Sequence, residues 1–152
     1  MNVDITAEVR VARPPAEVAA YMTDPEHDPE WIGGVSAVRM ETPPPVAVGT
    51  RVARVAGFLG RRVEYVNEVA GLDDEHLEMR SVVAPFPMQI TYSFVPEGGG
   101  GTIVRNRVRG RPGGVFALFG PLLAPLVRRS VQRDLERLRG VLERRGATTP
   151  RS

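Results

Sequence analysis

The sequence has no cysteine, no lysine and only two histidines, His27 and His76. The lack of cysteine excludes disulfides, a thiolate nucleophile, iron–sulfur clusters and cysteine-ligated zinc. The lack of lysine excludes Schiff-base catalysis, Ser–Lys catalysis and a Walker-A phosphate site. Because the two histidines lie 49 positions apart, we expect neither a metal site nor a redox cofactor.

Long apolar runs are also missing. The longest, residues 115–127, has 13 residues with two prolines, whereas roughly 20 are needed to cross a bilayer. The first eleven residues alternate in polarity and do not resemble a secretory signal. We therefore expect a cytoplasmic protein with one domain over residues 1–146 and a flexible tail over 147–152.

Charge is unevenly distributed along the 152 residues, although the net charge is only +2. Residues 1–100 hold eight arginines against fifteen acids, which gives −7, and residues 101–152 hold twelve against three, which gives +9. A basic end of this kind can bind nucleic acid or a membrane. The alternative, which we favour, is an acidic body that packs against a basic helix.

Hydrophobic periodicity predicts the elements. Residues 3–11 alternate strictly, which is typical of a half-buried strand, and Arg13 to Glu17 opens a short helix with two prolines in its first turn. A second short helix is expected near Trp31. Turn-forming residues then separate six strands, expected near 34–41, 48–57, 61–70, 76–83, 87–95 and 102–110.

The last element is predicted to be one long helix. From Phe116 to Leu142, apolar residues recur at steps of three and four, which indicates one buried stripe. Pro121 and Pro125 predict a short lead-in, a kink and a main helix that begins near 121–125. Gly146 is the expected C-cap. The economical fold is α+β, with a curved seven-stranded antiparallel sheet wrapped around this helix and two short helices after the first strand.

Four stretches resemble the START-like (SRPBCC) superfamily, most closely its polyketide cyclase/dehydrase-like branch with the helix-grip fold. They are residues 11–18, residues 24–35 with Asp24-Pro25 and Trp31, residues 84–102 with Ala84-Pro85-Phe86-Pro87-Met88, and residues 134–143 with Asp134-Leu135-Glu136-Arg137-Leu138. The resemblance covers about residues 2–145. It implies a hydrophobic cavity between sheet and long helix that binds lipids, polyketides or other apolar small molecules. It transfers no catalytic set, because the superfamily has no universal catalytic residues.

Strand parity predicts which side chains face that cavity. The polar candidates for catalysis are Tyr65, Tyr92 and Arg54, which can hold a carbonyl or an enolate by hydrogen bonds. The alternatives are core tyrosines and, for Arg54, a one-residue register slip that turns it to solvent. The expected ligand-binding residues are Trp31, Val52, Asn67, Met79, Ser81, Met88, Ile90, Phe94, Val104, Asn106, Phe116, Phe119 and Leu123.

Other residues carry weaker signals. His27, in an acidic loop, is a possible general base, but a solvated role is the commoner one for such a histidine. Trp31 either closes the cavity or staples the second helix to the sheet. Parity places Arg80 and His76 on the surface.

Two functions remain open. One is cofactor-independent cyclisation, aromatisation or dehydration of an apolar substrate, and the other is a non-catalytic carrier or sensor. Peripheral membrane or nucleic-acid binding through the basic helix is a third alternative. We do not expect nucleic acid as a partner, nor membrane contact if the apolar stripe faces the sheet, and we expect a monomer or homodimer.

Overall fold

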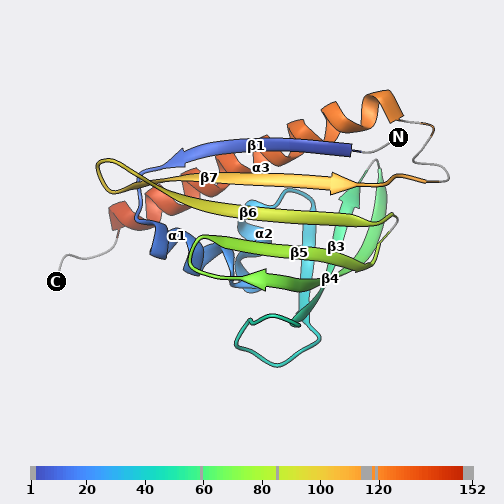
Figure 1. The fold of residues 1–152 in the computed structure, drawn as a ribbon, viewed down its shortest axis with the longest axis horizontal. Coiled ribbons are helices and arrows are strands. Elements are labelled where there is room, and N and C mark those ends of the chain that lie inside the picture. The colour runs from blue at the N-terminus through green and yellow to red at the C-terminus, as the bar shows by residue number, and fades with distance from the viewer. Residues whose placement is uncertain (1–2, 59, 85, 114–117, 119, 149–152) are drawn as a thin grey trace.

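The computed structural model describes residues 3–58, 60–84, 86–113, 118 and 120–148. Strand β1 (Val3–Val11) is followed by helix α1 (Pro15–Met22), the 3-10 turn η1 (Pro25–His27) and helix α2 (Asp28–Trp31). Six strands follow, namely β2 (Val35–Met40), β3 (Arg51–Phe58), β4 (Arg61–Leu72), β5 (His76–Val83), β6 (Met88–Glu97) and β7 (Gly101–Gly110). Helix α3 (Gly120–Thr148) ends the described chain (Figure 1).

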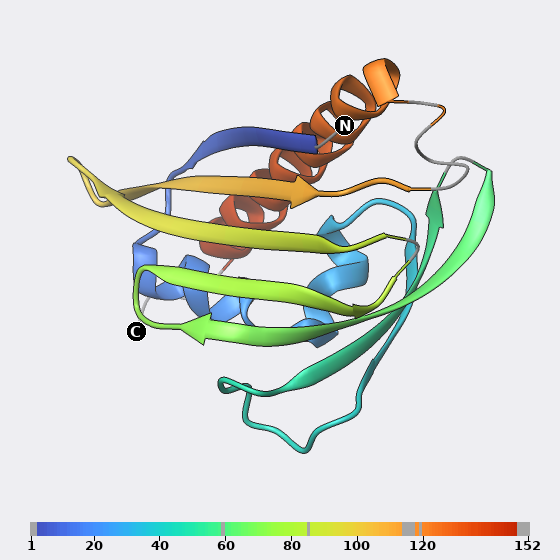
Figure 2. The same ribbon diagram turned by 45° about the vertical axis from the view of Figure 1, so that its right-hand side comes forward.

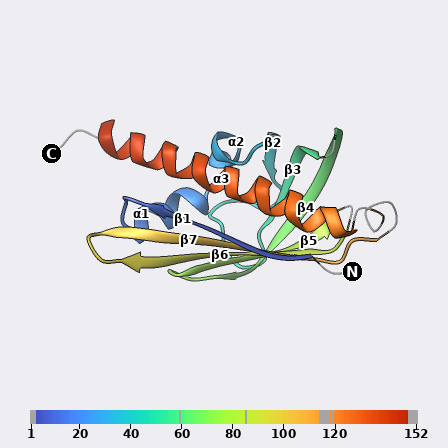
Figure 3. The same ribbon diagram turned by 90° about the horizontal axis from the view of Figure 1, so that it is seen from above.

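The seven strands form one antiparallel sheet in the order β1-β7-β6-β5-β4-β3-β2. The first strand, β1, is therefore an edge strand and pairs with the last strand, β7. The register of β4 against β5 shifts near Val66 and again near Val69, and that of β2 against β3 shifts near Val35. Such bulges bend a strand and increase its twist. The half of the sheet that contains β2 and β3 accordingly curves up beside α3 (Figures 2 and 3).

The described helices all lie on one face of the sheet, and α3 runs along its full length beside β1 (Figure 3). The alternation predicted for residues 3–11 is confirmed, because every odd residue of β1 is buried and every even one is exposed. Helix α3 turns Leu135, Leu138 and Leu142 to this face, where they are fully buried. The helix-grip architecture expected from the sequence is therefore present.

Two predicted boundaries need correction, and the predicted start of the long helix agrees to within one residue. Strand β3 begins at Arg51, not at 48, so Val48 lies in a loop with 64% of its surface exposed instead of facing inward. Helix α3 continues through Gly146 to Thr148, so Gly146 is not its C-cap. The helix begins at Gly120 and contains Pro125 within its span. Phe116 and Phe119, expected on the buried stripe, lie outside the described residues, as do 149–152 of the predicted tail.

Ion pairs on the outer face explain part of the charge asymmetry. Arg107 and Arg105 of β7 pair with Asp4 and Glu8 of β1 at 2.8 and 2.9 Å. Part of the positive charge at the end of the sequence therefore lies in β7, where it pairs with acids of β1, and β1 also packs against the basic helix α3. No helix within the described part of the chain combines the length and the apolar composition that crossing a membrane requires.

Candidate functional site

An apolar pocket of about 200 Å³ lies between the concave face of the sheet and α3. The sheet contributes Val35, Ala56, Val63, Met88, Ile90 and Val108 to its lining. Val127 and Val131 of α3 form the opposite wall, because they are one helical turn apart on the buried side of the helix. The pocket therefore occupies the position that the family resemblance implies for a ligand cavity.

Two residues with ionisable side chains, Tyr65 of β4 and Asp134 of α3, line this mainly apolar pocket together with Ser130 of α3. Asp134 accepts a hydrogen bond from the backbone N–H of Gly33 at 2.8 Å and contacts Arg137 at 3.4 Å. Arg137 also donates to the carbonyl of Trp31 at 3.1 Å. This cluster joins α3 to the segment between α2 and β2 at the edge of the pocket, and we call it the Asp134 latch.

Burial sets the ionisation of both groups. It raises the pKa of Asp134 to about 6, although the Gly33 N–H and Arg137 oppose the shift. It also raises the pKa of Tyr65, with the Arg54 cation opposing. Tyr65 is therefore a neutral phenol that can donate a hydrogen bond, and Asp134 exchanges its proton close to neutral pH.

Behind the pocket, Arg54 is buried, so the register slip that would expose it does not occur. Its Nε donates to Oδ2 of Asp28 at 2.6 Å, and both side chains are almost fully enclosed. Burial raises the pKa of Asp28 although Arg54 opposes the shift. Arg54 lies directly across from Tyr65 in the β3–β4 register, while its Nη1 has no hydrogen-bond partner among the described residues.

Tyr92 continues this polar interior. It is buried, its ring packs edge-on against Trp31 with centroids 5.9 Å apart, and burial raises its pKa. Arg54 and Tyr92, with Asp28, line a nearly closed cavity of about 10 Å³, room for roughly one water molecule. The side-chain oxygens of Asn67 and Asn106 are buried nearby in the sheet, with no partner recorded among the described residues. Several unpaired buried polar atoms in one region are unusual for a plain core.

The other described residues of the predicted site fall in four places. Met88 and Ile90 line the 200 Å³ pocket, and Val52 and Met79 line the small cavity beside Arg54. Trp31, Phe94, Val104 and Leu123 are buried in the core, outside the lining of either space. Ser81 accepts a hydrogen bond from the Met88 backbone at 2.8 Å.

The weaker candidates lie away from the pocket. His27 stacks on Tyr21 with ring centroids 4.2 Å apart, and its Nδ1 lies 3.0 Å from the Tyr21 carbonyl. Arg80 is exposed and pairs with Glu68. Within the described residues, no three histidine or acidic side chains gather closely enough to hold a metal ion.

Sequence reasoning missed Asp28 and Asp134 as site residues. The spacing of Asp134 could have identified it. It follows Val127 and Val131 at the interval of three or four residues that defines the buried face of the helix, and a carboxylate is unusual on such a face. Asp28 carried no comparable signal. Its burial depends on meeting Arg54, which lies 26 positions further along the chain.

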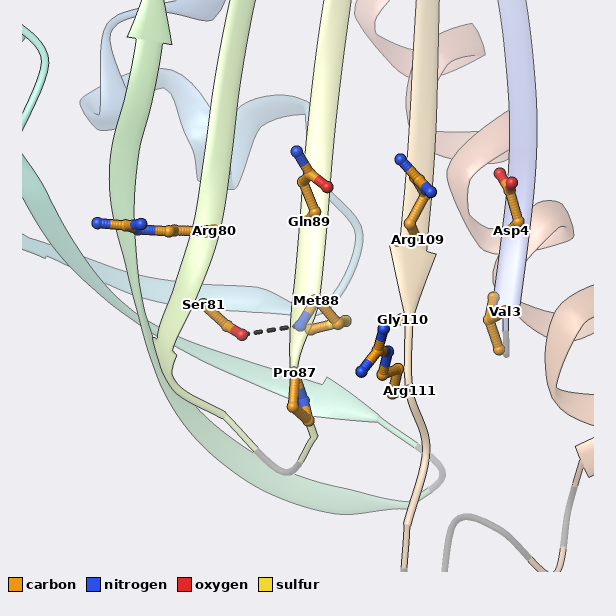
Figure 4. A pocket seen from close by; sticks show the side chains of 10 residues that line it. All are labelled: Val3, Asp4, Arg80, Ser81, Pro87, Met88, Gln89, Arg109, Gly110 and Arg111. Atoms are coloured by element: carbon orange, nitrogen blue, oxygen red, sulfur yellow. Dashed lines mark hydrogen bonds between the residues drawn. The ribbon is translucent and has the colours of Figure 1, made fainter. Parts of the chain in front are cut away.

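A larger groove of about 440 Å³ lies on the other face of the sheet, near the ends of β5, β6, β7 and β1 (Figure 4). Arg80, Gln89 and Arg109 reach it from successive strands, and Arg111 adds a further cation. Charged, solvent-open lining suits an apolar ligand poorly. The enclosed pocket under α3 is therefore the better candidate site.

Comparisons with known proteins agree with this geometry. Residues 2–143 match the model of a family described as polyketide cyclase/dehydrase and lipid transport. Comparison with curated proteins gives no match. Among solved structures, protein TTHA0849 from Thermus thermophilus is 27% identical, with a TM-score of 0.74 and coverage of 96% of this chain and 99% of that one.

Two further structures share the fold at low identity. A START superfamily protein from Mycobacterium smegmatis is 14% identical, with a TM-score of 0.81 over 93% of this chain and 97% of that one. The Zhui aromatase/cyclase from Streptomyces sp. R1128 is 17% identical, with a TM-score of 0.80 over 95% and 96%. With the family model matched over nearly the whole length of the chain, this protein belongs to the polyketide cyclase/dehydrase and lipid transport family.

Proposed function

We propose that this protein binds an apolar small molecule, of polyketide, lipid or aromatic type, in the pocket under α3. The observation that carries the proposal is a pocket with mainly aliphatic lining and two convergent polar groups, Tyr65 and Asp134. This composition is typical of small-molecule sites. Its volume of about 200 Å³ exceeds the roughly 150 Å³ of an engineered cavity that takes up benzene. We therefore propose a ligand segment of one or two rings, or its aliphatic equivalent.

Cyclisation, aromatisation and dehydration all move protons beside a carbonyl and build charge on its oxygen. The neutral Tyr65 hydroxyl is suited to donate to that oxygen, and Arg54, across the β3–β4 ladder, supplies positive charge nearby. Asp134, with a pKa of about 6, is suited to act as general acid or base. Tyr92 is the third predicted catalytic group, and it lines the small cavity beside Arg54.

A carrier or sensor is the second candidate, and one observation favours it. The charge of Arg54 is already balanced by Asp28 at 2.6 Å, which reduces the field available to a developing oxyanion. Turnover separates the two candidates. Protein purified from its native host is analysed by mass spectrometry for bound compounds, and an identified compound is then incubated with the protein. Product formation supports the enzyme, and unchanged compound supports the carrier.

Binding itself is tested by filling the pocket. Ala56 lines the pocket, whereas Ala53 lies on the opposite face of the same strand, so each can be replaced by leucine as a matched pair. Ligand-observed NMR with benzene, indole and naphthalene measures occupancy. We expect wild type and Ala53→Leu to bind and Ala56→Leu to lose binding at least tenfold. Equal binding by both variants would remove the pocket as the site.

Catalytic roles are tested residue by residue on the identified substrate. Tyr65→Phe and Tyr92→Phe remove one hydroxyl each, and the double variant Arg54→Leu/Asp28→Leu removes the cation without leaving Asp28 buried and unpaired. The removal of one hydrogen-bond donor from an oxyanion site typically lowers kcat by about 10²–10³. Unchanged rates in all three variants would overturn the assignment while leaving ligand binding intact.

A further inference from the structure

Three leucines at the beginning of α3 are exposed to solvent. Leu118, two residues before the helix, is 82% exposed, and Leu122 and Leu126 are 64% and 40% exposed. They stand four residues apart, and we call them the leucine stripe. Large apolar side chains that gather on a surface, and are not scattered singly, mark an interaction site.

The stripe faces away from the fold. At 100° per residue, Leu122 and Leu126 point opposite the direction of Val131 and Leu135, which are buried against the sheet. Among the elements that the structure describes, none covers this side of α3 (Figure 3). The sequence prediction followed only the buried stripe that contains Leu123 and Val127, and did not recognise a second apolar face on the same helix.

Cations follow the stripe along the helix, because at 100° per residue Arg129 and Arg133 share its direction, whereas Arg128 points well to one side. Arg128, Arg129 and Arg133 are exposed, and no ion pair of theirs is recorded among the described residues. Together with Pro125, Gln132 and Glu136 they line a shallow groove of about 370 Å³ on the outer side of α3. Two such guanidinium groups beside exposed leucines match two layers of a bilayer surface, namely the anionic headgroups and the acyl boundary beneath them.

We propose that the outer face of α3 docks on an anionic lipid membrane, with the leucine stripe in the acyl boundary and Arg129 and Arg133 at the headgroups. Nucleic acid would use the arginines and leave the leucines exposed. A second copy packed on the same face would bring two clusters of like charge together. An anionic bilayer can contact both parts of the surface, the leucines through its acyl chains and the arginines through its headgroups. Because the inner side of the same turns, at Val127 and Val131, lines the apolar pocket, docking places that pocket beside the lipid phase.

The test is co-sedimentation of the full chain with vesicles of phosphatidylcholine alone or with 30% phosphatidylglycerol. At low salt we expect binding to the anionic vesicles only, weakening as salt rises. Each cation near such a surface contributes about 1 kcal/mol, so the double variant Arg129→Gln/Arg133→Gln is expected to bind about 30-fold more weakly. The control pair Arg61→Gln/Arg62→Gln makes the same charge change in the β3–β4 hairpin and is expected to stay within about threefold of wild type.

The apolar half is tested separately. Leu122→Ser/Leu126→Ser leaves the core untouched and is expected to lose at least tenfold in binding to anionic vesicles. As a direct reporter, Leu122→Trp is expected to shift its emission to the blue on vesicle addition, whereas Val48→Trp, exposed in the β2–β3 loop, is not.

Four results would overturn the proposal. These are no binding by wild type to anionic vesicles, equal losses in the test and control arginine pairs, tighter binding to duplex DNA than to vesicles, and a dimer in sedimentation velocity that the leucine substitutions disperse. None of these outcomes bears on the small-molecule pocket, which is tested with Ala56.

Discussion

Replacement of Asp134 by asparagine is predicted to stabilise the protein at pH 8 and to have no effect on its stability at pH 4. The native structure raises the pKa of this carboxyl from 3.8 to about 6, so the folded protein holds the proton more tightly than the unfolded chain. Stability contributed by this group therefore rises as the pH falls from above 6 toward 4, and falls as the pH rises. Asparagine removes the charge and keeps an oxygen that can accept from the Gly33 N–H.

The size of the effect follows from the shift. A difference of about two pKa units corresponds to roughly 3 kcal/mol, and because Asp134 is partly open to solvent we expect about 1–2 kcal/mol. For a chain of this size, that raises Tm by roughly 2–8 °C. Urea unfolding followed by Trp31 fluorescence is the suitable assay, because Trp31 is the only tryptophan, is buried, and accepts a hydrogen bond at its backbone carbonyl from Arg137 of the latch.

The control for this prediction is Glu136→Gln, an exposed carboxylate on the same helix. It is expected to change stability by less than about 0.5 kcal/mol at either pH. Comparison of variants at each pH cancels the opposite contributions of Asp4, Glu68 and Asp73, whose pKa values are lowered by hydrogen bonds. If Asp134→Asn is destabilising at pH 8, or if its effect is the same at pH 4, the reasoning is refuted.

Two further predictions concern the interior. Arg54→Leu leaves Asp28 buried without a partner and is expected to cost about 3–5 kcal/mol, whereas Arg54→Leu/Asp28→Leu is expected to recover most of that loss. Urea unfolding of both variants measures this, and an equal loss in both would show that the ion pair is not the cause. Leu138→Ala, at a fully buried position of α3, is expected to cost about 2–5 kcal/mol, against less than about 0.5 for the exposed Leu122→Ala. Similar thermal shifts for the two leucines would contradict the assignment of the buried face.

The local pattern of the sequence predicted the secondary structure well. Alternation in residues 3–11 identifies a strand, and the turn-forming residues between the later strands identify their connections, because side-chain period and turn chemistry are properties of a few adjacent residues. The prediction was wrong where the alternation of apolar residues extends beyond the hydrogen-bonded part of a strand. Val48 shares the parity of Val52, yet the chain there is a loop and not a strand.

The candidate site was predicted only in part. Strand parity placed Tyr65, Met88 and Ile90 toward the cavity, and the structure puts all three in the pocket lining. Parity could not separate pocket from core, so Phe94 and Val104 were included although they are packed within the core. Which inward residues border a space depends on the distance between α3 and the sheet, and no single segment of the chain encodes that distance.

The sequence by itself determined the succession of strands and helices, the single long amphipathic helix and the exclusion of covalent and metal chemistry that depends on cysteine or lysine. These follow from composition and from periodicity over a few residues. Only the tertiary structure decided the contacts that give the site its chemistry. Asp134 meets Gly33 across 101 positions, and Arg54 meets Asp28 across 26. Their burial shifts the protonation of the two carboxyl groups, and burial of this kind exists only once distant segments have packed together.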